Sequence, residues 1–295
     1  MANPVETSII IPVFNEAENL AKLLEQIRAL GLADSEIIVV DDGSRDGSAE
    51  IAMAAGANVV RHPYNIGNGA AVKSGMRAAQ GRVMVMMDGD GQHKPADIPK
   101  LLDGLKLFHM VVGARAKGSK LRLHRNLANM VYNLLASYVT RFKVEDLTSG
   151  FRAMRRRDAL RFIDLLPNTF SYPTTITLAF LRSGLTVKYE PIQTLYRAGQ
   201  SKISLITDGI LFLLIITKIA TLFAPFRIFL PVSLFFFLAG VGNYVYTYAT
   251  QGRFTNMSVF ALTTAVIIFM LGLISEQIAL LRMERQESGR RRDDG

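Results

Sequence analysis

Two long apolar stretches without a charged residue lie near the C-terminal end of the sequence. One runs from Ile228 to Thr250 and the other from Thr255 to Ser275, and only QGRF separates them. At about 1.5 Å per residue, a helix of either length crosses a hydrocarbon core of roughly 30 Å. Buried helices of a large soluble domain are the alternative, but two such stretches in succession favour a membrane hairpin. We expect two transmembrane helices within residues 226–281, at about 228–250 and 255–279.

Charges around this hairpin predict its orientation. Five arginines follow the second stretch, within the tail 282–295. The positive-inside bias places that tail in the cytoplasm. Two spans return the chain to the side of its N-terminal part, where MANPVETSIIIPVFNE does not have the pattern of a secretory signal. The expected location is the cytoplasmic (inner) membrane, as a multi-pass protein with its N-terminal domain and C-terminus in the cytoplasm.

Residues 204–225 form a third apolar segment, which differs from the other two. It carries Asp208 and Lys218 and ends at Pro225. A third span would place the arginine-rich tail outside, against the charge bias. We therefore favour a juxtamembrane helix lying in the membrane interface, with a third span as the alternative.

The first 203 residues alternate between short apolar runs and segments of helical spacing, which predicts an α/β domain with a doubly wound, mostly parallel sheet. Ligands of such sheets bind at the carboxyl ends of the strands. Polar clusters follow the apolar runs at those ends: NE, DDGS, HPYNIGNG and DGDGQH. The strands are expected at 8–14, 35–44, 58–62 and 83–87, and the helices at 15–30, 46–56 and 69–81.

Two acids follow the fourth expected strand, where a plain turn needs only one. In an extended backbone Asp88 and Asp90 point the same way, and two carboxylates that share a site repel unless a cation lies between them. Gln92 could add a neutral oxygen, so Asp90, Asp88 and Gln92 form a candidate site for Mg²⁺ or Mn²⁺. A plain turn remains the alternative. His93 has no second histidine near it in the sequence, which favours a structural or supporting role over metal ligation.

The composition of the chain limits the classes of partner and site that we expect. The formal net charge is +9, which favours anionic partners such as nucleotide phosphates, lipid phosphates or an acidic membrane surface. Nucleic acid is the weaker candidate, because the sequence has no basic run interleaved with aromatic residues. The chain has no cysteine, which excludes disulfides, thiolate catalysis and cysteine-type zinc sites. A dinucleotide fold is weakly supported, because GNGAAV lacks the third glycine at Val72 and follows the third strand rather than the first.

Taken in order, IPVFNE, VVDDGSRDGS, NIGNGAAV and MDGDGQH resemble the family-2 glycosyltransferases, whose catalytic domain is called GT-A (Rossmann-like). Farther along, GARAKGSKLRLHRNLANMVYNLL, DLTSGFRAMRR and YRAGQSKIS resemble the branch that makes polyprenyl-phosphate sugars, such as dolichyl-phosphate mannose synthases and undecaprenyl-phosphate glucosyltransferases. The resemblance covers about 200 residues. The family often has alanine where Gly89 stands and threonine where Ser48 stands, and both replacements are small.

The resemblance implies a nucleotide-diphosphate sugar as donor, a polyprenyl phosphate as acceptor, inversion at the anomeric carbon, and tetramers in some relatives with such a tail. It also implies roles for individual residues. Asp90 is the main metal ligand and a catalytic residue. Nucleotide-binding residues are Pro12, Glu16, Asp41, Asp42, Asp88, Arg197 and Lys202.

Cations would hold the acceptor phosphate. Arg125 is the first candidate and is also placed among the catalytic residues, and Arg115 is the second. Asp146, the third catalytic candidate, would orient the sugar or the acceptor, with Arg152 as its potential partner. Each has a plainer alternative, because arginines are usually solvated and Asp146 could merely cap a helix.

We therefore expect a metal-dependent membrane glycosyltransferase at the cytoplasmic leaflet, with a UDP-sugar favoured over GDP-mannose as donor. A nucleotide-binding scaffold without activity is one rival. A processive polysaccharide synthase is another, but such enzymes carry a Q-x-x-R-W motif and this chain has no tryptophan.

Overall fold

The computed structural model describes residues 5–115, 130, 133–134, 136–138, 140–168, 172–193, 221 and 224–293, with side chains as far as residue 281. The chain divides into two compact units, Met1–Ile203 and Ser204–Gly295. Of the segment expected to lie in the membrane interface, only residues 221, 224 and 225 are among those described, so that prediction lies outside the described part of the chain.

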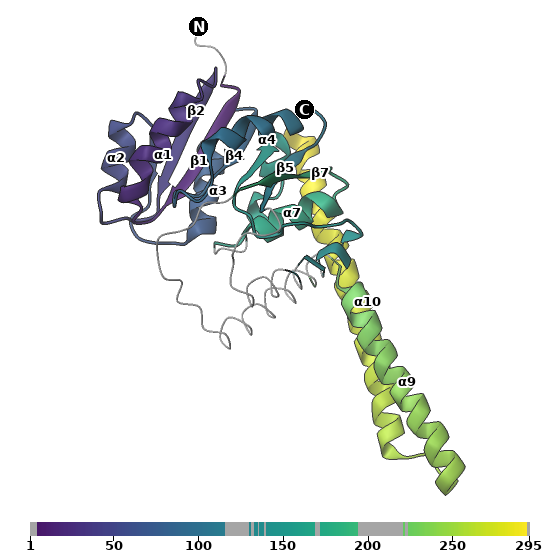
Figure 1. Ribbon diagram of the computed structural model, residues 1–295. Coiled ribbons are helices and arrows are strands. Elements are labelled where there is room, and N and C mark those ends of the chain that lie inside the picture. The colour runs from purple at the N-terminus through teal and green to yellow at the C-terminus, as the bar shows by residue number, and fades with distance from the viewer. Residues whose placement is uncertain are drawn as a thin grey trace. The chain divides into compact units, whose positions relative to one another are not determined.

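The first unit is built on a seven-stranded sheet with the order β3-β2-β1-β4-β6-β5-β7 (Figure 1). Strand β6 runs antiparallel to both neighbours, and the other pairs are parallel. The four strands expected from the sequence are present as β1 to β4; β1 begins and ends one residue earlier than expected, and the other three end earlier. The strands are β1 (Thr7–Val13), β2 (Ser35–Asp41), β3 (Asn58–Arg61), β4 (Val83–Met86), β5 (Met110–Arg115), β6 (Arg152–Arg155) and β7 (Val187–Ile192).

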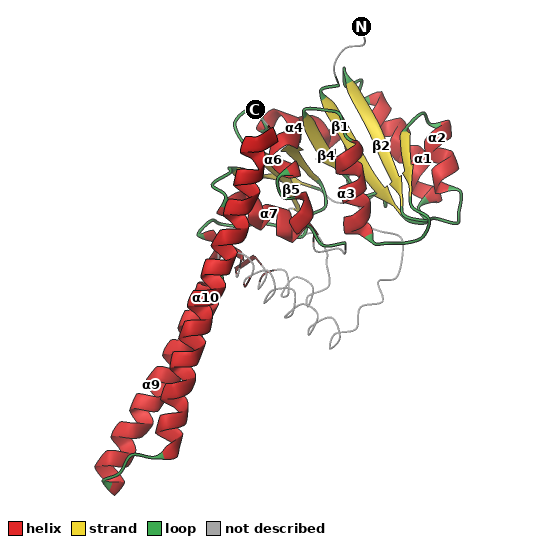
Figure 2. Cartoon of the chain, turned by 180° about the vertical axis from the view of Figure 1, so that it is seen from behind, coloured by secondary structure: helices red, strands yellow, loops and turns green. Residues whose placement is uncertain are grey.

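Helices cover both faces of this sheet, so the expected doubly wound α/β architecture is confirmed (Figure 2). Because β1 lies between β2 and β4, the direction of winding reverses next to β1, and ligands bind at such points in open α/β sheets. The helices and helical turns of this unit include α1 (Ala17–Ala29), α2 (Ser48–Ala54), α3 (Asn68–Ala78), η1 (Pro95–Asp97), α4 (Ile98–Gly104), α6 (Arg156–Leu160), η2 (Ile163–Leu165) and α7 (Tyr172–Arg182).

Alternation along β1 sends its side chains into two separate layers of the core. Ile9 and Ile11 belong to the fully buried cluster that includes the apolar face of α1. Ile10 points to the other face, against Gly75 of α3. A Cβ at Gly75 would collide with Ile10 and approach Val40 Cγ2 to 3.2 Å, so the glycine lets α3 lie close on the sheet. These layers fix the strand ends from which the polar loops emerge.

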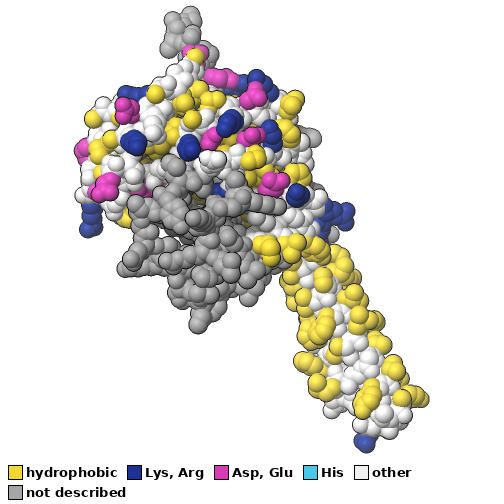
Figure 3. All heavy atoms as spheres, viewed as in Figure 1, with side chains coloured by type: hydrophobic (Ala, Val, Ile, Leu, Met, Phe, Trp, Pro, Cys, Tyr) yellow, Lys and Arg dark blue, Asp and Glu magenta, His cyan; other side chains and the backbone are white. Residues whose placement is uncertain are grey.

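The second unit contains two long helices, α9 (Phe226–Gln251) and α10 (Asn256–Asp293). Gly252, in the left-handed conformation with φ 62°, ends α9. Phe226–Gln251 and Asn256–Leu281 are both long and apolar enough, by length and composition, to cross a membrane. Hydrophobic side chains are spread along the visible face of this hairpin (Figure 3). The tail expected at 282–295 continues α10 as helix to Asp293.

Small and polar residues join α9 to α10, as is usual for helices that pack in lipid. A Cβ at Gly240 would lie 2.9 Å from Leu262 Cγ, so the glycine admits the leucine of the opposite helix. Ser233 Oγ donates to the carbonyl of Ala265 at 2.9 Å. Asn243 Nδ2 donates to Ser258 Oγ, also at 2.9 Å. The two helices therefore form one closely packed hairpin.

Candidate functional site

The loops that follow β1 and β2 are joined by hydrogen bonds at the carboxyl edge of the sheet. Asn15 adopts a left-handed conformation with φ 55°. Its N–H donates to Ser44 Oγ at 3.0 Å, and its Oδ1 accepts from the N–H of Arg45 at 2.9 Å. The N–H of Glu16 donates to Ser48 Oγ at 3.1 Å. Asn15 was not among the predicted site residues, although asparagine is one of the few residues that tolerate this conformation.

Asp46 completes this junction by capping a helix from another loop. Its Oδ2 accepts the N–H of Ala17, in the first turn of α1, at 2.9 Å. Its Oδ1 accepts from Ser48 Oγ at 2.6 Å. Burial would raise the pKa of Asp46, but the hydrogen bonds from Ser48 and Ala17 hold it below its ordinary value. A carboxylate near a helix N-terminus is favourable, so Asp46 fixes the start of α1.

Asp41 is fully buried at the end of β2, and its two oxygens differ. Oδ1 accepts the N–H of Ser44 at 2.9 Å. Oδ2 accepts no hydrogen bond from the residues that the structure describes. Arg61 Nε lies 3.3 Å from it, but without the geometry of a hydrogen bond. A buried carboxylate oxygen without a donor is costly, so this oxygen is suited to accept an N–H or O–H from a ligand.

Asp42, by contrast, is engaged within the protein. Its Oδ1 lies 2.7 Å from His62 Nδ1 and accepts the N–H of Ile66 at 3.0 Å, and its Oδ2 accepts the N–H of Gly67 at 2.8 Å. His62 in turn lies 2.9 Å from Ser74 Oγ through Nε2. These bonds hold the loop after β3 against the loop after β2. The expected contact of Asp42 with the nucleotide remains a prediction.

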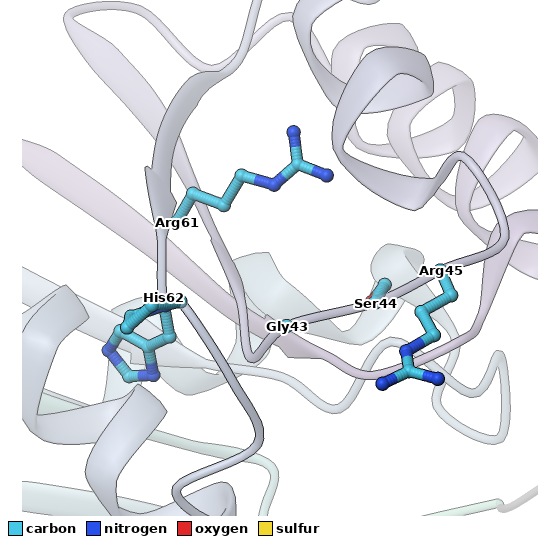
Figure 4. A pocket seen from close by; sticks show the side chains of 6 residues that line it. Gly43, Ser44, Arg45, Arg61 and His62 are labelled. Carbon is cyan, nitrogen blue, oxygen red and sulfur yellow. The ribbon is translucent and has the colours of Figure 1, made fainter.

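A hollow of ≈ 390 Å³ opens beside these loops and is lined by Gly43, Ser44, Arg45, Arg61, His62 and Pro63 (Figure 4). Arg61 extends from the end of β3, and Arg45 leaves the turn at Gly43 and Ser44. Gly43 has φ 78°, and a Cβ there would lie 2.7 Å from the backbone of Tyr64, so the two loops can meet only at a glycine. Two arginines beside a hollow make it suitable for an anionic or hydrogen-bond-accepting ligand.

Asp88, Asp90 and Gln92 lie together on the loop after β4, and all three side chains are half-buried. Asp90 Oδ1 accepts the backbone N–H of Gln92 at 3.1 Å. The carboxylate of Asp88 lies against Gly150, where a Cβ would come within 3.0 Å of Asp88 Cγ. The loop that carries Asp146 therefore borders the loop after β4, which we call the acidic loop.

This donor set fits a divalent cation that is shared with a phosphate ligand. No group of three or more acidic, histidine or cysteine side chains within the described residues could hold a metal by itself. Mg²⁺ is commonly bound by one or two carboxylates, with substrate phosphates completing its coordination. Asp88 and Asp90 supply two such carboxylates, and Gln92 supplies a neutral oxygen.

His93 is buried beneath the acidic loop. Its ring stacks on Phe151 with centroids 5.1 Å apart, and its Nδ1 has no hydrogen-bond partner among the described residues. Burial lowers the pKa of His93 to about 4, against the opposing charge of Asp90. The imidazole is therefore neutral near pH 7, in a position where it supports the loop from below.

Arg115 and Asp146 form a pair with two parallel contacts. Nε of Arg115 lies 2.7 Å from Oδ2 of Asp146, and Nη2 donates to Oδ1 at 2.9 Å. The same Oδ1 accepts the N–H groups of Thr148 and Ser149 at 3.1 and 3.2 Å. Burial would raise the pKa of Asp146, but the hydrogen bonds and charge of Arg115 hold it below its ordinary value. Burial would lower the pKa of Arg115, yet Asp146 raises it.

This pairing bears on two expectations. Arg152 does not pair with Asp146: it is fully buried and donates to the carbonyl of Pro173 at 2.9 Å, to Thr177 Oγ1 at 3.0 Å and to the carbonyl of Ser149. Arg115 donates to Asp146 through Nε and Nη2, and its side chain is 18% exposed, so its expected contact with the acceptor phosphate remains a prediction. Neither arginine is the solvated surface charge that was the plainer alternative, and Asp146 caps a turn rather than a helix.

The remaining predicted site residues are Pro12, Glu16, Arg125, Arg197 and Lys202. Pro12 is buried at the end of β1, and Glu16 is half-buried in the next loop, both beside the junction of the first two loops. Arg125, Arg197 and Lys202 lie outside the described residues, so their expected roles remain predictions.

Family models match both units. The model for glycosyl transferase family 2 matches residues 8–161, and the model for the GtrB C-terminal hairpin matches residues 224–281. The chain is 28% identical to glycosyltransferase AglJ of Haloferax volcanii, over 97% of this chain and 98% of the relative. It is 29% identical to an undecaprenyl-phosphate 4-deoxy-4-formamido-L-arabinose transferase of Pectobacterium carotovorum subsp. carotovorum, over 92% and 87% of the two chains.

A solved structure shares the fold of the first unit. Glucosyl-3-phosphoglycerate synthase from Mycobacterium tuberculosis, in complex with Mn²⁺, UDP and glucosyl-3-phosphoglycerate, superposes with a TM-score of 0.59. The similarity covers 73% of this chain and 78% of the synthase, at 22% sequence identity. The expected GT-A architecture is thereby confirmed.

Proposed function

Because the chain belongs to glycosyl transferase family 2, in the branch that makes polyprenyl-phosphate sugars, we propose that it transfers a hexose from a nucleotide-diphosphate sugar to a polyprenyl phosphate. Undecaprenyl and dolichyl phosphate are both candidate acceptors. The observation that carries this proposal is the presence in one chain of a two-helix apolar hairpin and of Asp88 and Asp90 after a central strand. One feature suits a lipid substrate and the other a metal-bound diphosphate.

The environment of Asp41 favours a uracil base over guanine. Uracil presents a single N–H between two carbonyl groups, whereas guanine presents two adjacent donors on the corresponding edge. Asp41 has one oxygen engaged by Ser44 and one oxygen without a hydrogen bond from the described residues, which suits a single donor. Arg61 lies beside that oxygen with a side chain 54% exposed and also donates to Glu50 Oε1 at 3.2 Å, so a rotation away from these two carboxylates would let it donate to a base carbonyl. A UDP-sugar is therefore the preferred donor, and GDP-mannose the alternative.

The acidic loop would receive the diphosphate. Asp90 would be the main ligand of Mg²⁺ or Mn²⁺, with Asp88 and Gln92 beside it. When bound, such a cation neutralises the charge that develops on the leaving diphosphate. The relative crystallised with Mn²⁺ and UDP has the same fold, which supports a divalent cation here. Asp46, Asn15 and Ser44 would hold the first two loops in place around the nucleotide.

The acceptor phosphate would act as the nucleophile. Its second pKa is about 6, so the monoester is largely ionised at neutral pH and needs no strong general base. One of its oxygens would form a bond to the anomeric carbon while the bond from that carbon to the diphosphate breaks, with inversion. The Arg115–Asp146 pair borders this place: Asp146 would position the sugar or acceptor, and Arg115 would hold Asp146 ionised. Arg125, Arg197 and Lys202 would supply the free cations.

Membrane attachment follows from the hairpin. We propose that α9 and α10 span the cytoplasmic membrane and that both the catalytic unit and the C-terminus face the cytoplasm, where nucleotide sugars are available. The arginine-rich end of α10 agrees with this orientation. Because the acceptor is a lipid, a membrane anchor in the same chain raises the local concentration of enzyme around its substrate.

The test uses the full-length protein purified in detergent, with undecaprenyl phosphate, Mn²⁺ or Mg²⁺ and a panel of UDP- and GDP-sugars. We expect release of nucleoside diphosphate with a UDP-sugar, dependent on both the lipid and the metal. Binding of nucleotide without turnover for any donor would contradict the proposal and favour a scaffold without activity. Repeated addition of sugar to one acceptor would instead indicate a processive synthase.

A further inference from the structure

The side chain of Arg152, at the start of β6, is fully buried. Among the described residues it is the largest side chain that is fully buried. Its partners are two carbonyl oxygens and a hydroxyl, those of Ser149, Pro173 and Thr177. Among the described residues it forms no ion pair with a carboxylate, and its Nε has no hydrogen bond. A buried guanidinium without a paired carboxylate is costly, so this arrangement calls for a compensating role.

The charge of Arg152 acts on the acidic residues of the site. Burial lowers the pKa of Arg152, and the nearby groups of Tyr172, Tyr189, Asp146 and Asp88 oppose this shift. Asp88 is therefore close enough for its charge to interact with that of Arg152. The nearest cation to Asp146 is already Arg115, at 2.7 Å.

The backbone supplies a second connection. Arg152 holds the carbonyl of Ser149, and the next residue, Gly150, lies directly against the carboxylate of Asp88. Its other two hydrogen bonds fix the same loop to the first two turns of α7. A shift of this loop would therefore displace the surface on which Asp88 rests.

We propose that Arg152 is a positioning residue for Asp88: it fixes the Ser149–Gly150 backbone against the Asp88 carboxylate and supplies a buried positive charge behind it. This inference rests on the proposed function, in which Asp88 faces the donor nucleotide and its cation. Arg152 itself contacts neither, so its loss should weaken binding of nucleotide with metal through Asp88 alone.

The experiment measures the Kd of Mn²⁺-dependent UDP binding by calorimetry on the full-length protein, which needs no turnover. We expect Arg152→Met and Gly150→Ala each to raise this Kd about tenfold, as for other residues that support a metal ligand. Arg152→Lys, which keeps the charge, should have a smaller effect. The matched control is Arg155→Met, on the same strand, where Arg155 also donates to a carbonyl, that of Leu105. It should change the Kd by no more than about twofold.

A double-mutant cycle separates positioning from general damage. In an Asp88→Asn background, Arg152→Met should add no further loss, because both changes act through one carboxylate. Equal Kd values in wild type and Arg152→Met, or losses that multiply in the double variant, would overturn the inference.

If Arg152→Met does not fold, the Kd values of Arg152→Lys and Thr177→Val are compared with that of wild type instead. Absence of UDP binding by the wild-type protein would overturn the proposed function as well, whereas wild-type binding unchanged by these substitutions overturns the inference alone.

Discussion

Arg115 and Asp146 are 31 residues apart in the sequence, yet the guanidinium of one meets the carboxylate of the other through two contacts, of 2.7 and 2.9 Å. Arg115 ends β5, and Asp146 lies in the loop that leads into β6. The pair therefore closes the gap between two neighbouring strands at the edge of the sheet where the acidic loop lies. Because it is mostly shielded from water, we expect its loss to lower the stability of the protein.

Removing one partner leaves the other charge uncompensated. We expect Arg115→Met to lower the free energy of unfolding by about 3–5 kcal/mol, the usual range for breaking a buried pair from one side. Chemical denaturation of the purified protein measures this. Lys106→Met, which breaks the exposed Lys106–Asp103 pair, serves as control and should cause no measurable change. An equally small effect of Arg115→Met would show that the pair contributes nothing to stability.

The pKa of Asp146 predicts how this contribution depends on pH. Its folded value lies below its ordinary value, which is about 3.9 in an unfolded chain. Its contribution is therefore fully present above about pH 4 and is lost as the pH falls through the folded pKa. The difference in free energy of unfolding between wild type and Asp146→Asn, measured by chemical denaturation in a series of buffers, should be constant from pH 5 to 8. It should shrink below about pH 4. A difference that grew in acid would contradict the assignment.

Asp41 should determine how well the base is bound. Asp41→Asn replaces a charged acceptor by a neutral amide, and a hydrogen bond to a charged group contributes about 1.5–3 kcal/mol. We expect the Kd for UDP to rise about tenfold or more. The exposed Asp103→Asn is the matched control. If Asp41→Asn bound UDP as well as wild type does, the buried oxygen would not be the base acceptor.

His93→Phe tests whether the histidine ligates the metal or only supports the loop. Phenylalanine keeps a ring on Phe151 but has no nitrogen. We expect the Mn²⁺ concentration for half-maximal activity to stay within about twofold of wild type, the range of a neutral substitution. A rise comparable to that caused by losing a carboxylate ligand would show that His93 binds the metal.

The sequence predicted the strands and the acids that follow them, because buried parallel strands are apolar runs bounded by turn residues. It could not predict which acids remain available to a ligand. Asp41 and Asp42 are adjacent, yet one keeps an oxygen without a donor from the described residues while the other is used by His62 and two backbone N–H groups. Partners 20 or more residues away decide this difference.

The second half of the catalytic unit was harder to predict. The partner of Asp146 was expected to be Arg152, which is six residues away, but β5 brings Arg115 to it instead. A signal for the burial of Arg152 was present, since FRAM places an arginine inside an apolar run. The hairpin, in contrast, was readily predicted, because length and hydropathy alone determine whether a helix can span a bilayer.

We propose that the carboxylates after β4 hold the metal-bound diphosphate while the sugar is transferred to a lipid phosphate. The most direct measurement follows a labelled sugar from its UDP donor into organic-extractable lipid, with wild type, Asp90→Asn and the exposed control Asp103→Asn side by side. We predict a product of one sugar on one polyprenyl phosphate from wild type and from Asp103→Asn, and loss of this product in Asp90→Asn. Lipid-linked product from Asp90→Asn at the wild-type rate would contradict the account.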